Sequence, residues 1–62
     1  MKSRDIIRKL KKAGWAEVRQ SGSHKQFRHP DRKGTVTVPH PNSDMAIGTI
    51  KSIEKQSGVK LR

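Results

Sequence analysis

Three histidines are the residues of this chain best suited to acid–base chemistry, and His24 stands out among them. It follows Gly22 and Ser23, which indicate a turn, and it opens a stretch that reads as a β-strand. Imidazole exchanges protons near neutral pH, which suits both halves of general acid–base catalysis. One imidazole is enough to activate a hydroxyl group for attack on a phosphate, provided that nearby cations stabilise the charge that develops on the phosphate. Position alone leaves an alternative open, an exposed strand histidine without a role.

The other two histidines are weaker candidates. His40 lies between Pro39 and Pro41, where a second catalytic or orienting role competes with a plain loop histidine. His29 precedes Pro30 in a predicted hairpin loop, where a role is less expected. The separations of 5 and 11 residues between the histidines match no common zinc spacing, and the chain has no cysteine. We therefore expect neither a metal site nor a cofactor.

Positive charge is the strongest signal in the composition. Fifteen Lys and Arg face five Asp and Glu, which gives a formal net charge of +10 at pH 7. Such an excess repels itself and favours a polyanionic partner, with nucleic acid first. Double-stranded RNA readers use helix and loop cations against the backbone and the 2′-hydroxyls. We expect the RNA-binding residues to be Ser23, Lys25, Arg28, Lys9 and Lys12.

The first element that must position these residues is a helix over 3–13. Ile6, Leu10 and Ala13 recur at helical spacing, and Gly14 is a natural stop. Ser3 is predicted to cap its start. A second helix is predicted over 46–57, with Ile47, Ile50 and Ile53 on one side and Gly58 as its stop; Val59 and Leu61 are expected to fold back onto the core.

Three strands are predicted between the helices, over 15–20, 24–28 and 35–38. A turn over 21–23 joins the first two, a hairpin loop over 29–34 joins the last two, and an extended connector over 39–44 follows. The fold class is therefore α+β, in the order α-β-β-β-α, with a three-stranded antiparallel sheet in sequential order. We expect residues 1–62 to form one domain.

Strand alternation predicts which side chains share a face of the sheet. Phe27, Val36 and Val38 are expected to be buried against the helices, together with Trp15. His24, Gln26, Arg28, Thr35 and Thr37 are expected on the open face. If Arg28 pairs with Thr35, His24 lies beside Pro39 and His40.

Length and composition exclude several classes of protein. The chain has 62 residues, of which 29% are hydrophobic, so the core is thin. Without cysteine there is no disulfide to compensate. No apolar run is longer than three residues, which is too short for a membrane span or a secretory leader. We therefore expect a cytoplasmic protein that does not insert into membranes.

Taken together, these segments resemble the HicA toxins. The resemblance runs through Ser3–Leu10, Gly14-Trp15, Gly22–Phe27, Val38–Pro41 and Ile47–Gly58, and so covers nearly the whole chain. No single segment is specific, but the set is. The chain departs from the usual family pattern at Met45-Ala46 and Ser57, which concerns local packing only.

The resemblance implies a fold like that of a double-stranded RNA-binding domain. It also implies the toxin of a type II toxin–antitoxin pair, a metal-independent mRNA interferase whose catalytic histidine is the one in the Gly-Ser-His motif, here His24. A HicB-like antitoxin is implied as the inhibitory partner that covers this histidine. Two alternatives use the same charge without catalysis, a basic RNA-binding module and an adaptor for an acidic protein.

Overall fold

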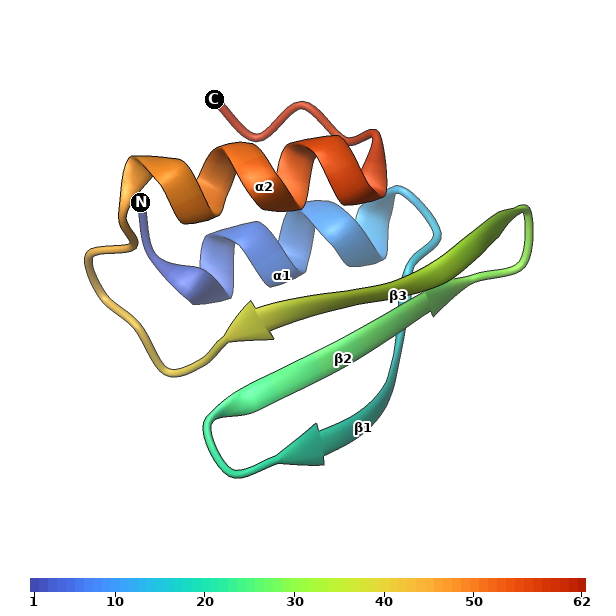
Figure 1. The fold of residues 1–62 in the computed structure, drawn as a ribbon, viewed down its shortest axis with the longest axis horizontal. Helices are drawn as coiled ribbons and strands as arrows, with labels where there is room; N and C mark the ends of the chain where they lie inside the picture. Colours follow the sequence, from blue (N-terminus) through green and yellow to red (C-terminus); the bar gives the residue numbers. More distant parts are fainter.

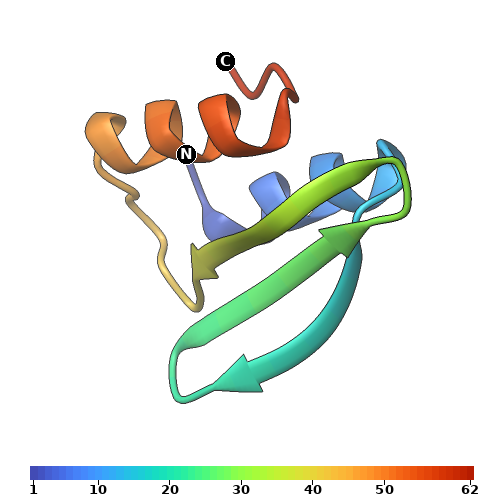
Figure 2. The same cartoon turned by 45° about the vertical axis from the view of Figure 1, so that its right-hand side comes forward.

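A computed structural model describes residues 1–62. Its elements follow the order α1 (Ser3–Lys12), β1 (Ala16–Ser21), β2 (His24–His29), β3 (Arg32–Pro39) and α2 (Ile47–Ser57). The three strands form one antiparallel sheet in the order β1-β2-β3. Both helices lie side by side against one face of this sheet, and the opposite face is open (Figures 1 and 2). The predicted α+β class and the sequential strand order are confirmed.

The core fills the space between the two layers. Phe27 at the centre of β2 is completely buried and pairs with Val36 on β3. Side chains from all parts of the chain close around this pair, including Ile6 and Leu10 of α1. Burying a side chain of this size stabilises the fold by about 1.5–3 kcal/mol, so a few residues carry most of the stability. The predicted burial of Trp15, Val38 and Leu61 is confirmed, and Val59 packs against the same core.

The second helix faces the core differently from its prediction. Ile47 was expected on the buried side with Ile50 and Ile53, but it is 55% exposed. It is the first residue of α2 and lies outside the buried stripe, which Ile50, Ile53 and Ser57 form. Met45, just before the helix, takes the buried place instead.

The hairpin between β2 and β3 is tighter than predicted. A loop over 29–34 was expected, whereas β3 already begins at Arg32 and only Pro30-Asp31 form the turn. The ladder continues through a His29–Arg32 pair after a shift in register. The Asp31 backbone N–H donates to His29 Nδ1 at 3.0 Å, which holds the turn closed. Elsewhere the predicted element ends differ from the observed ones by at most one residue.

Ser3 does not cap α1 as predicted. Lys2 occupies the cap position without a side-chain cap bond, and Ser3 is the first helical residue. Its side chain is buried, and its Oγ accepts a hydrogen bond from the Asn42 backbone N–H at 2.9 Å. Ser3 therefore attaches the connector after β3 to the start of α1.

Gly14 ends the first helix where only glycine fits. Its φ is +99°, and a Cβ built there would lie 2.7 Å from His29 Nε2. His29 occupies this place because its Nε2 lies 3.1 Å from the Ala13 carbonyl oxygen and its ring packs against Trp15, with centroids 5.3 Å apart. Because Asp31 N–H donates to Nδ1, Nε2 carries the proton and donates to Ala13.

We predict that Gly14→Ala lowers the free energy of unfolding by about 1–3 kcal/mol from backbone strain, with a further loss from displacement of His29. Gly34→Ala is the matched control, because Gly34 has a φ of +87° but no atom within 4 Å of the built Cβ. Urea denaturation of both variants measures the difference. Equal losses would show that the contact with His29 contributes nothing.

Glu54 holds the C-terminal residues against α2. Its Oε2 accepts hydrogen bonds from the backbone N–H groups of Leu61 and Arg62, and its Oε1 lies 3.0 Å from the Arg62 guanidinium. The pKa of Glu54 is lowered, chiefly by the hydrogen bond from the Leu61 backbone. Desolvation, the next largest effect, opposes this, and the side chain and backbone of Arg62 lower the pKa further. The charged form is therefore favoured by folding.

A lowered folded pKa means that this stabilisation is full above the unfolded pKa of Glu54 and is lost as the pH falls through the folded value. We predict that Glu54→Gln is less stable than the wild type at neutral pH and that the gap closes in acid. Melting temperatures of both proteins between about pH 6 and about pH 2 measure it. A gap that stays constant over this range would contradict the prediction.

Candidate nucleic-acid interface around His24

His24 opens β2 directly after the two-residue turn of Gly22 and Ser23. It pairs with Ser21 on β1 and with Pro39 on β3. The position beside Pro39 is the one predicted from the sequence. Its side chain is exposed and shares the open face with the alternate residues of β2. The histidine ring hydrogen bonds in this structure belong to His29 and His40, so both nitrogens of His24 are free. An exposed, unpartnered imidazole is thus available to a ligand on the open face.

Arg28 lies on the same face as His24, four residues along β2, and is exposed. The strand rise places their Cα atoms about 13 Å apart. The Arg28 guanidinium is therefore better placed to contact a part of the ligand next to the part that His24 contacts. Gln26 lies between them and is half-buried.

Arg19 joins this face and was missed in the sequence. It pairs with Gln26, so it lies beside the centre of β2 on the open side, and it is exposed. A register shift between Glu17 and Arg19 changes the alternation of β1 at Val18. Simple alternation from the buried Trp15 would have turned Arg19 towards the helices. No residue pattern marks this bulge, because bulges are set by the pairing of two strands.

Lys25 is on the opposite face from His24. It pairs with Val38 and Gln20, and its ammonium lies 3.0 Å from Glu17 Oε2 and 2.9 Å from Gln20 Oε1. The structure therefore does not bring Lys25 to the imidazole. Its positive charge is already balanced by a carboxylate on the neighbouring strand.

Lys9 and Lys12 are exposed on α1, in the helical layer that covers the other face of the sheet. Lys9 Nζ donates to the Leu61 carbonyl oxygen at 3.3 Å, while Lys12 ends the helix. The residues selected from the sequence thus fall into two groups, one on the open face with His24 and one on α1.

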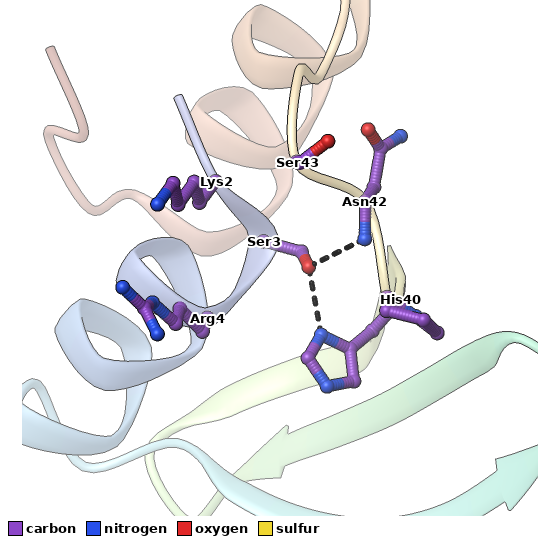
Figure 3. A pocket seen from close by; sticks show the side chains of 7 residues that line it. Lys2, Ser3, Arg4, His40, Asn42 and Ser43 are labelled. Atoms are coloured by element: carbon purple, nitrogen blue, oxygen red, sulfur yellow. Dashed lines mark hydrogen bonds between the residues drawn. The ribbon is translucent and has the colours of Figure 1, made fainter.

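Ser23 contributes to the site through its backbone. Its carbonyl oxygen accepts a hydrogen bond from the His40 N–H at 2.7 Å, which ties the turn before His24 to the connector after β3. The His40 ring turns away towards α1, where Nδ1 lies 2.7 Å from Ser3 Oγ (Figure 3). His40 therefore lies close to His24 along the backbone, with its ring in a separate environment.

Gly48 has no packing role. It lies in the first turn of α2, is exposed, and has no atom within 4 Å of a Cβ built on it.

The charge of the surface is largely unpaired. Three ion pairs occur, Arg8–Asp5, Lys25–Glu17 and Arg62–Glu54. They involve three of the 15 basic residues, so most of the excess positive charge faces solvent. No group of three or more His, Asp or Glu side chains is placed to hold a metal ion, and no helix is long and apolar enough to cross a membrane.

Comparison with known proteins agrees with this geometry. The search of curated proteins found no match. A chain from the solved structure of a HicA3 and HicB3 toxin–antitoxin complex is 32% identical over the full length of both chains and superimposes with a TM-score of 0.78. The family model described as the HicA toxin of bacterial toxin–antitoxin systems matches residues 3–59. Because this match spans nearly the whole sequence, the chain belongs to the HicA toxin family.

Proposed function

We propose that this protein is a metal-independent endoribonuclease that cleaves mRNA, with residues 1–62 acting as one toxin domain in the cytoplasm. The observation that supports this most is the free imidazole of His24 on an open, cationic face of the sheet. Membership of the HicA toxin family favours the same function.

In the proposed reaction the RNA supplies its own nucleophile. His24 accepts the proton of a ribose 2′-hydroxyl, whose oxygen then attacks the adjacent phosphorus. The bond from phosphorus to the 5′-oxygen breaks, and that oxygen leaves as an alcohol after taking a proton from His24 or from water. Every proton and bond is thus accounted for without a protein nucleophile, which suits a face that presents no activated serine or cysteine.

The cations of the open face bind the strand rather than react. Arg19 and Arg28 lie on either side of Gln26, on two adjacent strands, where they can hold phosphates next to the cleaved one. A guanidinium presents a rigid fork of donors that matches a phosphate. Lys9 and Lys12 act at longer range by raising the local concentration of RNA. Lys25 keeps its ion pair with Glu17, which joins β2 to β1.

A HicB-like antitoxin is the proposed protein partner. The structural match comes from a complex of HicA3 with HicB3, which supports a partner of that kind for this chain. We propose that an acidic antitoxin covers His24 and the open face, because that face is exposed, cationic and free of any covering element of the chain itself.

We predict that His24→Ala reduces the rate of RNA cleavage by about 10²–10⁴-fold, which is the usual contribution of a general acid–base group. The measurement is cleavage of a labelled mRNA in excess chelator. Thr35→Ala, an exposed change on the same face, is the control and should cleave at the wild-type rate; circular dichroism checks that both variants are folded.

Two outcomes would count against the nuclease. Cleavage by folded His24→Ala at the wild-type rate would remove the catalytic role of this residue. Intact RNA with a clear gel shift for the wild-type protein would favour a binding module without catalysis.

We further predict that an acidic HicB-like antitoxin raises the melting temperature of this protein. A partner that binds only the folded state at about 100 times its Kd adds about 2.7 kcal/mol, which for a domain of this size corresponds to a rise on the order of 10 °C. Differential scanning fluorimetry with and without saturating antitoxin measures this. An unrelated acidic protein is the control, and an unchanged melting temperature with the antitoxin would contradict the prediction.

A further inference from the structure

A polar cavity lies outside the site described above, close to the backbone of the turn that carries His24. It has a volume of about 260 Å³, is open to solvent, and lies between the start of α1 and the connector after β3. Figure 3 shows Lys2, Ser3 and Arg4 on the side of α1, and His40, Asn42 and Ser43 on the side of the connector. Pro41 completes the lining, and no acidic or large apolar side chain takes part.

The charge of this cavity is not neutralised within the protein. Lys2 and Arg4 are exposed, and neither belongs to any of the three ion pairs. Two cations on a polar wall without a carboxylate attract an anion. The cavity differs in this from the surface around Lys25, where a glutamate already balances the charge.

Ser3 prepares His40 to donate a hydrogen bond. The Ser3 side chain is buried, its Oγ accepts from the Asn42 backbone N–H, and its other partner is His40 Nδ1 at 2.7 Å. A buried hydroxyl needs an acceptor for its hydrogen, and Nδ1 is the one available. The proton of a neutral His40 therefore sits on Nε2, on the side of the ring away from Ser3, where it can be donated to a ligand.

The cavity is joined to the turn that carries His24. Pro39 pairs with His24, and the next residue, His40, donates its N–H to the Ser23 carbonyl oxygen. Paired strands are about 5 Å apart, so the backbone of His40 at the cavity wall lies close to the turn that carries His24. The His40 ring points towards α1, whereas the His24 imidazole is on the open face. RNA carries a charge at every nucleotide, so a strand bound at His24 places further phosphates on either side of the one there.

We propose that this cavity binds a further phosphate of the RNA strand that lies at His24, at the point where the strand passes around the end of the sheet from the open face towards α1. Lys2 and Arg4 supply the charge, His40 Nε2–H supplies a directed donor, and Ser3 is a positioning residue that sets the orientation and tautomer of His40. This inference rests on RNA being the substrate, and it names a binding subsite that cleavage itself does not require.

The test is a comparison of two double variants with the same loss of charge. Lys2→Gln/Arg4→Gln removes both cations of the cavity, and Lys51→Gln/Lys55→Gln removes two exposed, unpaired lysines of α2. Neutral residues at the start of α1 do not oppose the helix dipole, so the first variant is expected to fold. The probe is a short 2′-O-methyl RNA, which lacks the nucleophile and stays intact.

Fluorescence anisotropy at several salt concentrations gives the affinity and its salt dependence. We expect the cavity variant to bind the RNA about tenfold more weakly. The negative slope of log K against log salt should become shallower by about 0.7, which corresponds to the loss of one phosphate contact to a single strand. The α2 variant should keep the wild-type slope. The His40 Nε2 resonance of the wild type should shift on binding in ¹⁵N NMR.

Other results would overturn the subsite. Equal losses in both variants would reduce it to general attraction between opposite charges. Unchanged RNA binding by the cavity variant, with loss of binding to poly-glutamate, would assign the cavity to an acidic protein instead. Because the probe is not cleaved, failure here leaves the nuclease test with unmodified RNA unaffected, and a failed nuclease test leaves this measurement valid.

Discussion

The pairing of Phe27 with Val36 at the centre of the sheet determines the arrangement of the rest of the molecule. Only one face of the three strands is covered by helices, and Phe27 must lie on that face to be buried. Since side chains alternate along a strand, His24 and Arg28 then lie on the uncovered face. A shift of β2 by one residue would bury the imidazole of His24 and the guanidinium of Arg28 and expose the phenyl ring of Phe27. Burying these polar groups without partners is strongly unfavourable, so the observed register is fixed.

The same pairing sets the relation between the two regions proposed to bind RNA. His24 lies opposite Pro39, so the connector that follows β3 starts beside the imidazole and then turns towards α1. Ser3 accepts a hydrogen bond from this connector, and His40 donates its N–H to the turn before His24. The connector thereby links the start of α1 to the β1–β2 turn, although these segments are far apart in the sequence.

Charge and stability act against each other in this chain. A net charge of +10 on 62 residues opposes compaction, and a small core offers limited compensation. Local devices reduce the cost at a few points, such as the Lys25–Glu17 pair across β1 and β2 and the attachment of the C-terminal residues by Glu54. The remaining cations stay free, which is consistent with a surface that meets a polyanion and with added stability when a partner binds.

Much of the architecture is determined by the sequence itself. The helical spacing of Ile6 and Leu10, the turn at Gly22 and the alternation around Phe27 are local signals, so the element order, the sheet order and the face of His24 follow from them. Other features depended on tertiary structure. Four features depend on how the elements pack against one another. They are the bulge at Val18 that brings Arg19 to the open face, the exposure of Ile47, the ion pair of Lys25 and the hydrogen bond between Ser3 and His40. Such contacts form only when the helices pack against the sheet, so no local sequence pattern predicts them.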